Sequence, residues 1–262
     1  MSADELRLDV VNDDLKLYQY ADGLTFGTDA LLLAAYARRD PGARAIEFGG
    51  GTGIVSLLLA ARNKVSSILS IEAQKEYADL IEKNARLNGL SDRVVSVFGD
   101  LRENDVCPGE GFDLVVTNPP YRKDGAGLVS PSDKKNAARC EIRGDISDFC
   151  RAAGRKLRTG GRFVCVYLPE RLPDLLFAMR EAGIEAKRAT VVSADPSALP
   201  SLVLVEGRRG AAPGMRLTRP LFLYRDAKHG APSREMQFIL DTGDFPVGFG
   251  DGTDPKEKGT KR

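Results

Sequence analysis

Residues 43–53 read ARAIEFGGGTG, and this stretch decides the fold. A short apolar run, Ala43–Phe48, ends directly at a cluster of glycines, as a buried strand does when the chain turns sharply. The next residues, Thr52–Arg62, place apolar side chains at helical spacing. Glycines at such a junction let the backbone approach a ligand closely, and a helix N-terminus favours anionic groups. The stretch therefore predicts a strand, a ligand-binding loop and a helix.

Short apolar runs and longer amphipathic runs alternate through much of the chain. The expected strands are residues 67–72, 93–98, 112–117 and 162–168, and the expected helices are residues 74–88, 146–157 and 170–181. Such alternation builds a mostly parallel sheet with helices on both faces. After Gly183 the runs are consecutive strands, which predicts an antiparallel edge; they lie near residues 186–193, 202–206 and 221–224. The pattern predicts an α/β, Rossmann-like fold.

Charge and composition exclude several classes of protein. The chain has 262 residues, with 38 Lys and Arg against 37 Asp and Glu and a formal net charge of +1. This balance argues against a protein that coats nucleic acid by charge alone. The single histidine, His229, excludes metal centres built from several histidines. None of the four cysteines forms a Cys-x-x-Cys pair, so we expect reduced thiols and no metal site.

Two short segments flank the expected main domain. Residues 1–24 form an N-terminal extension, in which residues 15–20 are spaced as a strand or as part of a hairpin. The main domain covers residues 25–240, and residues 241–262 are rich in Gly, Asp, Thr and Lys, which predicts a disordered tail. The acidic N-terminus lacks an apolar core, and no run approaches the roughly 20 apolar residues of a membrane span. We therefore expect a cytoplasmic protein without a membrane partner.

The glycine loop leaves two ligands to compare, a dinucleotide and S-adenosylmethionine. A dinucleotide site needs Gly-x-Gly-x-x-Gly. Counted from Gly49 the third position is Ile54, and counted from Gly51 it is Ser56, so this fingerprint fails in both registers. Glu47 instead places a carboxylate at the end of the strand. A carboxylate there would repel a pyrophosphate but suits the ammonium group of S-adenosylmethionine.

Two further acidic residues follow strands. Glu72 ends the second strand, where a carboxylate can accept hydrogen bonds from the ribose hydroxyls of either ligand. Asp100 follows the third strand and can accept from an adenine amino group, although alone it would suit a turn. Three acidic residues at three consecutive strand ends favour a ligand site. The expected cofactor-binding residues here are Glu47, Gly49, Gly51, Gly53, Glu72 and Asp100.

Residues 117–121 read TNPPY and end the fourth expected strand. Two prolines stop a strand ladder and fix φ, so the motif could serve only as a terminator. Together with the glycine loop, however, it makes the chain resemble the class I S-adenosylmethionine-dependent methyltransferases of the amino-group branch. The chain is most similar to the bacterial tRNA methyltransferases that modify an adenine amine beside the anticodon. The closer resemblance is carried by residues 27–33, 118–121, 138–141, 202–210 and 220–224.

This resemblance implies a fold, a cofactor and a reaction. It implies a seven-stranded, mostly parallel sheet with a C-terminal antiparallel hairpin and helices on both faces. The cofactor is S-adenosylmethionine, and no metal is required. The Asn118 side chain and the Pro119 carbonyl accept the two N–H groups of the adenine N6 amine, while Tyr121 stacks on the base. The expected catalytic residues are Asn118, Pro119, Pro120 and Tyr121.

The resemblance also extends the cofactor site. Asn118 is expected to contact the cofactor as well as the amine. Thr28 and Asp29 open a helix, and they either cap that helix or contact the cofactor. Glu47 departs from the aspartate that is more usual in the family, so we expect cofactor binding to survive with a shifted contact.

Local charge is uneven although the total balances. Residues 122–158 hold ten Lys and Arg against five Asp and Glu, residues 201–234 hold seven against two, and residues 1–22 hold two against six. The first basic stretch directly follows the TNPPY motif, where a phosphate backbone would run if a base stacked on Tyr121. We therefore expect RNA, and by resemblance tRNA at position 37, as the partner. The expected contacts are Arg122, Lys123, Lys134, Lys135, Arg139, Arg208 and Arg209.

Four alternatives remain open. Enzymes that methylate a glutamine N5 in release factors carry a similar motif, but they usually have a helical domain before the glycine loop. Guanine-N2 methylation of ribosomal RNA is a second alternative. A nicotinamide oxidoreductase is disfavoured by the failed fingerprint, and a non-catalytic RNA-binding module by the intact motif at residues 118–121. The sequence determines no oligomeric state and is compatible with a monomer.

Overall fold

The computed structural model describes residues 5–12, 15–21, 23, 26–106, 109–120 and 144–249. The strands are β1 Leu6–Asn12, β2 Leu15–Tyr20, β3 Arg44–Phe48, β4 Ser67–Glu72, β5 Val94–Phe98, β6 Phe112–Thr117, β7 Leu157–Tyr167, β8 Ile184–Ser193, β9 Pro200–Arg209, β10 Arg216–Leu217 and β11 Leu221–Phe222. The helices are α1 Thr28–Tyr36, α2 Ile54–Ala61, α3 Lys75–Leu87, α5 Ile146–Lys156, the 3-10 turn Pro169–Arg171, α6 Leu172–Glu181 and α7 Arg234–Thr242.

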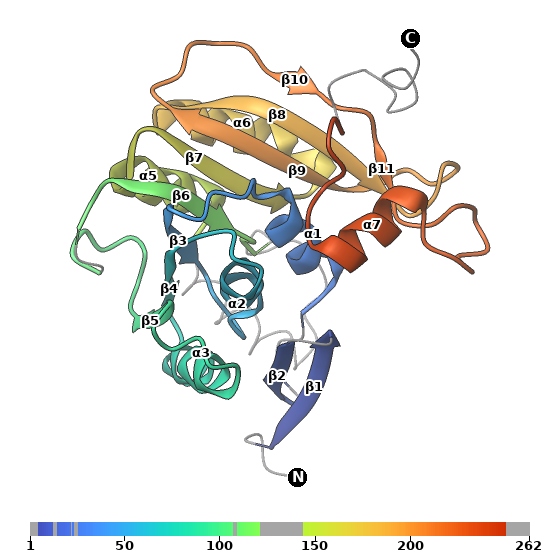
Figure 1. Cartoon of the computed structure of the whole chain (residues 1–262). Helices are drawn as coiled ribbons and strands as arrows, with labels where there is room; N and C mark the ends of the chain where they lie inside the picture. The colour runs from blue at the N-terminus through green and yellow to red at the C-terminus, as the bar shows by residue number, and fades with distance from the viewer. Residues whose placement is uncertain are drawn as a thin grey trace, which may run out of the picture.

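The central sheet has the strand order β10-β8-β9-β7-β6-β3-β4-β5, and β11 pairs with β8 (Figure 1). Strands β3 to β7 run parallel to one another, whereas β9 runs antiparallel to both β7 and β8. The predicted α/β fold, mostly parallel with an antiparallel hairpin, is therefore confirmed. The strand expected near residues 221–224 is present as β11, but it pairs with β8 in parallel and not as part of an antiparallel edge. The short strand β10 was not expected, and it also pairs with β8 in parallel.

The two faces of the sheet bury separate apolar clusters. On β6, Leu114 and Val116 face the cluster that includes α1, α2 and α3, while Val115 between them faces the cluster that includes α5 and α6. All three side chains are fully buried, as a parallel strand covered on both faces requires. In Figure 1, α1 and α2 lie in front of the sheet. None of the helices in the described part of the chain has the length and apolar character that crossing a membrane needs.

Strands β1 and β2 form a separate antiparallel hairpin. Asn84 of α3 binds the Tyr18 backbone at both ends, accepting from its N–H at 2.7 Å and donating to its carbonyl at 3.0 Å. The same side chain donates to the carbonyl of Thr52 at 2.9 Å. The hairpin is therefore tied to both α3 and the glycine loop.

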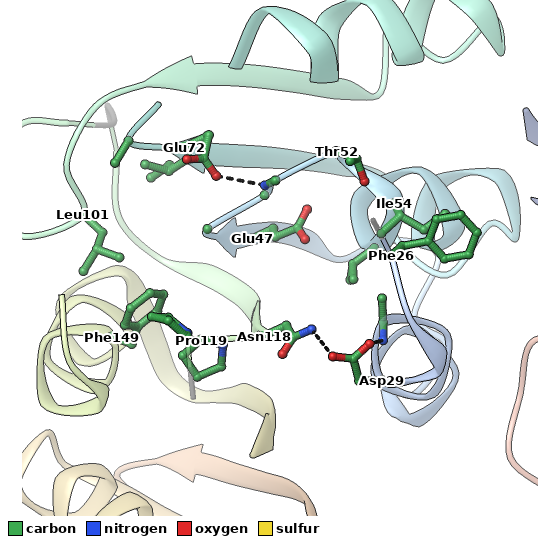
Figure 2. Close-up of a pocket in the computed structure, with 18 of the residues that line it drawn as sticks. Phe26, Asp29, Glu47, Thr52, Ile54, Glu72, Leu101, Asn118, Pro119 and Phe149 are labelled. Carbon is green, nitrogen blue, oxygen red and sulfur yellow. Dashed lines mark hydrogen bonds between the residues drawn. The ribbon is translucent and has the colours of Figure 1, made fainter. Parts of the chain in front are cut away.

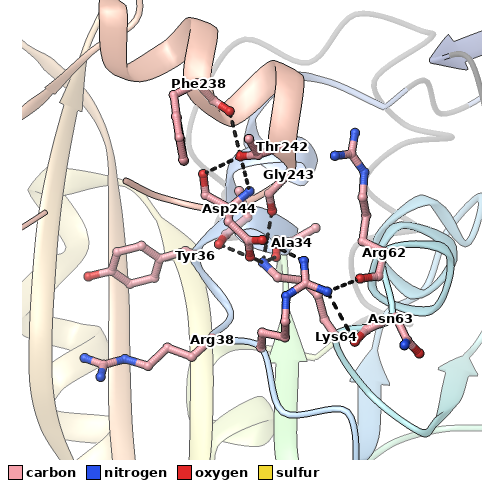
Figure 3. A network of polar contacts seen from close by, with 12 residues as sticks. Ala34, Tyr36, Arg38, Arg62, Asn63, Lys64, Phe238, Thr242, Gly243 and Asp244 are labelled. Carbon is pink, nitrogen blue, oxygen red and sulfur yellow. Dashed lines mark hydrogen bonds and ion pairs between the residues drawn. The ribbon is translucent and has the colours of Figure 1, made fainter. Parts of the chain in front are cut away.

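The segment after Asp241 differs from the expected tail, at least as far as residue 249. Helix α7 continues to Thr242, and Gly243 ends it in a left-handed conformation with φ +69°. Lys64, which is buried, donates to the carbonyl of Gly243 at 3.0 Å and pairs with Asp244 at 2.9 Å (Figure 3). Phe249 is only 6% exposed. The polar composition concealed these contacts, because they come from a buried cation and an aromatic ring and not from an apolar run.

Candidate active site

A cavity of ≈ 270 Å³ lies at the carboxyl ends of β3, β4, β5 and β6 (Figure 2). The chain order places it there, since β4 and β5 follow on one side of β3 and β6 and β7 on the other. Its lining includes Asp29, Glu47, Gly49, Gly51, Glu72, Asp100, Asn118, Pro119 and Pro120. The structure thus brings residues from five separate segments of the sequence to one cavity. Thr28 and Gly53 adjoin this lining in the sequence without belonging to it.

The glycine loop needs its glycines at particular positions. Gly51 has φ +55° and Gly53 has φ +84°, values that side chains with a Cβ rarely adopt. Gly53 is also the N-cap residue of α2, so the helix starts in the left-handed turn. A Cβ at Gly51 would meet no protein atom within 4 Å, so the loop presents bare backbone at this point.

Glu47 is buried, and its carboxylate is held by serines on two elements. Its Oε2 accepts from the Ser56 backbone N–H at 3.2 Å and from the Ser70 hydroxyl at 3.2 Å, and the Ser56 hydroxyl also donates to it. Burial raises the pKa of Glu47 to about 7, and the serine hydrogen bonds limit that rise. A cationic group placed beside this carboxylate would therefore favour its ionised form.

Glu72 binds the glycine loop directly. Its Oε2 accepts from the Gly51 N–H at 2.9 Å (Figure 2), and its Oε1 accepts from the Gln74 N–H at 3.0 Å. Each carboxylate oxygen has two lone pairs, so Glu72 can accept further hydrogen bonds from hydroxyl groups in the cavity. The carboxylate holds the loop in place and also lines the ligand space.

Asp100 serves a turn as well as lining the cavity. Its Oδ1 accepts from the backbone N–H and the Nε of Arg102, each at 2.9 Å. The guanidinium of Arg102 holds the pKa of Asp100 below its usual range. Asp100 therefore belongs to the turn that the sequence suggested and also lines the cavity, where its contact with an adenine amino group stays a prediction.

Asn118 and Asp29 are joined across 89 residues of sequence. The Asn118 Nδ2 donates to Asp29 Oδ2 at 2.9 Å (Figure 2), and the Ala30 N–H donates to Asp29 Oδ1 at 2.8 Å. Because a carboxylate only accepts, the amide must turn its NH₂ group toward Asp29 and its Oδ1 away from it. Gly27 is the N-cap residue of α1, so neither Thr28 nor Asp29 occupies the capping position. The sequence did not predict this pairing.

Two aromatic residues that the sequence pattern did not indicate also line the cavity. Phe149 comes from α5 and is 2% exposed, and its ring lies within 4 Å of where a Cβ at Gly49 would stand. Phe26 precedes α1, and its N–H donates to the buried Gln19 side chain at 3.0 Å. Only the periodicity of α5 indicated a buried face at Phe149, without saying against what it packs.

The expected RNA contacts divide into two groups. Tyr121 and the first group, Arg122, Lys123, Lys134, Lys135 and Arg139, lie outside the described residues. Arg208 pairs with Arg162 in the register of β9 and β7, whereas the carboxyl end of β7, at Tyr167, pairs with Val203. The cavity lies at the carboxyl ends of the parallel strands, so Arg208 and Arg209 lie near the opposite ends of these strands. They are not beside the site, because β9 runs antiparallel to β7.

Metal ligands do not gather in the part of the chain that the structure describes: no group of three or more His, Cys, Asp or Glu there could hold a metal ion. Cys150 and Cys165 are buried, and burial raises the pKa of both thiols.

Comparison with known proteins gives a family and a fold. The family described as methyltransferase small domain matches residues 20–173. A tRNA1(Val) (adenine(37)-N6)-methyltransferase of Porphyromonas gingivalis (strain ATCC 33277) is 30% identical over 189 residues, which cover 70% of this chain and 73% of the relative. The protein of the same name from Escherichia coli (strain SE11) is 28% identical over 184 residues, covering 68% and 73%.

Solved structures share the fold at lower identity. A predicted O-methyltransferase, Atu636 from Agrobacterium tumefaciens, aligns with a TM-score of 0.67 and 21% identity over 82% of this chain and 96% of its own. P. horikoshii TYW2 in complex with MeSAdo aligns with a TM-score of 0.55 and 16% identity over 80% and 74%. At these identities the likeness concerns the fold alone.

Proposed function

Since this chain belongs to the methyltransferase small-domain family, we propose that it transfers a methyl group from S-adenosylmethionine to the N6 amine of adenine 37 in a tRNA. The observation that carries the proposal is Asn118, held by Asp29 at the wall of a cavity that three carboxylates and a glycine loop also line. Relatives that cover about 70% of this chain bear the corresponding name. The cytoplasm is the compartment that we propose, since tRNA is modified there.

The cavity suits the groups that S-adenosylmethionine would present. Glu47 offers a buried carboxylate for an ammonium group, Glu72 offers acceptors for ribose hydroxyls, and Asp100 offers an acceptor for an adenine amino group. The bare backbone at Gly51 lets the ligand approach the loop without a side chain in the way. When bound, S-adenosylmethionine supplies an electrophilic methyl group on a positively charged sulfur.

Asn118 would act on the amine to be methylated. An aromatic amine is a poor nucleophile, because its lone pair is delocalised into the ring. Asn118 Oδ1 and the Pro119 carbonyl would each accept one N–H, which holds the nitrogen in line with the methyl group and favours its pyramidal form. Asp29 fixes the face of the Asn118 amide that makes this contact. Most of the rate enhancement would then come from positioning and electrostatics.

The target base must leave its stack to enter such a pocket. Enzymes that react at a base in a helix flip it out or act on an unpaired nucleotide. We propose that Tyr121 stacks on the flipped adenine, with a contribution of about 1–3 kcal/mol. Pro119 and Pro120 restrict the backbone before it, which favours a fixed position for the ring.

The test is methyl transfer from radiolabelled S-adenosylmethionine to unmodified tRNA transcripts, followed by mass spectrometry of the nucleosides. We expect label in N6-methyladenosine, and we expect it to disappear when adenine 37 is replaced by guanine. Ribosomal RNA and a release factor are assayed in parallel. Label in guanine N2 or in a glutamine side chain would overturn the adenine assignment, and RNA binding without any methyl transfer would indicate a non-catalytic module.

A further inference from the structure

A second cavity, of about 1000 Å³, lies away from the proposed active site. The end of α1 and the residues after it form one wall, the segment after α7 forms another, and β8 with the strand β10 forms the third. We call this cavity the distal groove. Its charged lining residues are Arg38, Arg39, Lys187, Arg188, Arg216 and Asp244.

Two of these cations build the groove. Arg39 donates to Asp244 at 2.7 Å and to the carbonyls of Arg62 and Asn63, which fixes the segment after α7 against the end of α2 (Figure 3). Arg188 lies over the Tyr36 ring, with 3.8 Å from its guanidinium carbon to the ring centroid. These two side chains are held in the walls of the groove.

The other cations lie on its rim. Arg38 is 59% exposed and bonds the buried Glu206 through Nε at 3.3 Å, and Figure 3 shows its side chain directed away from the Lys64 network. Arg216 is exposed on β10, and Lys187 is partly exposed. A guanidinium has five N–H donors, so one bond to Glu206 leaves Arg38 with donors for a further acceptor. Of the described residues that line the groove, five are Lys or Arg and one, Asp244, is a carboxylate, while Glu206 and Glu185 lie beside it.

Helix α1 connects the two cavities. Asp29, in its first turn, lines the proposed active site, and Tyr36, at its end, lines the distal groove. At 1.5 Å per residue, the nine residues of α1 span about 14 Å. Along a stacked strand this distance corresponds to roughly four nucleotides at 3.4 Å each. A nucleic acid with one base in the active site is therefore long enough to reach the groove.

We propose that the distal groove binds the phosphodiester backbone of the RNA substrate, through Arg38 and Arg216 on its rim. This inference rests on the proposed function. The planar fork of a guanidinium matches two phosphate oxygens, and a chain of phosphates suits cations that are spread along a groove. Phe238 and Met215, 39% and 38% exposed, add apolar surface for the sugar and base faces that lie between phosphates.

The test is the affinity of the full-length protein for a tRNA transcript, measured by fluorescence anisotropy. The salt concentration is varied from about 0.05 to about 0.3 M, because the release of counterions makes binding to phosphates depend strongly on salt in this range. The double variant Arg38→Gln/Arg216→Gln removes two phosphate contacts. Each contact contributes a salt exponent of about 0.7 to 0.9, so the affinity falls roughly 10- to 30-fold at about 0.15 M salt. The slope of log affinity against log salt becomes shallower by about 1.4 to 1.8.

Two further variants make the result interpretable. Lys75→Gln/Arg86→Gln removes two cations from α3, 62% and 66% exposed and each paired with a carboxylate, and is expected to leave RNA affinity within about twofold. Arg38→Lys/Arg216→Lys keeps the charge and is expected to restore most of the salt slope. The dissociation constant for S-adenosylmethionine, unchanged in all three, reports that the fold is intact.

The outcomes separate the two proposals. Equal RNA affinity for the groove variant and the wild type would overturn the inference, and so would an equal loss in the α3 control. If the wild type methylates tRNA but the groove variant binds it normally, the proposed function stands and the groove assignment is wrong. If no RNA is methylated while binding still depends on the groove, the groove assignment stands and the proposed function is wrong.

Discussion

Replacing Asp29 by alanine tests whether this residue positions Asn118 or binds the cofactor. In the wild type, the Asn118 Nδ2 donates to a half-buried carboxylate at 2.9 Å. A hydrogen bond to a charged partner contributes about 1.5–3 kcal/mol. If that free energy keeps the Oδ1 atom turned toward the amine, its loss lowers kcat about 10- to 150-fold. The dissociation constant for S-adenosylmethionine is expected to change by less than about threefold, since the bond does not involve the cofactor.

The assay is single-turnover methyl transfer with saturating tRNA, combined with calorimetric titration of S-adenosylmethionine. Asp29→Asn is the matched variant, because its amide keeps one acceptor oxygen but can also present NH₂ to Asn118; we expect an intermediate rate. In an Asn118→Ala background, Asp29→Ala should cause little further loss, because the two residues act as a unit. A full additional loss in that background, or weaker cofactor binding with an unchanged rate, would refute the positioning role.

Three more predictions concern the site and the fold. Asn118→Ala is expected to abolish methyl transfer and to leave the affinity for S-adenosylmethionine nearly unchanged; equal loss of both, measured by calorimetry, would contradict its role. Burial raises the pKa of Glu47 to about 7, so below that pH a bound ammonium must displace a proton, and affinity should fall as the pH drops from about 8 to about 6. Glu47→Gln should remove this pH dependence, and a dependence that persists would assign it to another group. Lys64→Met leaves three carbonyls and Asp244 without their ammonium, so the free energy of unfolding should fall by about 2–3 kcal/mol. Thermal melting compares this variant with Lys75→Met, a change at an exposed lysine of α3, and equal melting temperatures for the two variants would show that the network contributes little.

Local patterns in the sequence were enough to predict most of the fold. The apolar run before the glycines predicted β3, and alternating strands and helices predicted a covered, mostly parallel sheet. These predictions succeed because burial on both faces selects a continuous apolar strand, such as Leu114 to Val116, whatever lies elsewhere in the chain. The pattern also predicts that Glu47, Glu72 and Asp100 lie near one another. Each stands at or just after the carboxyl end of a strand, and the carboxyl ends of parallel strands lie on the same side of the sheet.

Contacts between distant segments were decided only by the tertiary structure. Asp29 and Asn118 are 89 residues apart, and no pattern near either residue predicts that the Asp29 carboxylate orients the Asn118 amide. Arg208 lies in a basic stretch that predicted an RNA contact, but it lies away from the cavity because β9 runs antiparallel to β7. The polar segment after Asp241 is held by Lys64 from another part of the chain. A pattern along the chain records which faces are apolar, whereas strand direction and the partner of each polar group depend on how those faces pack together.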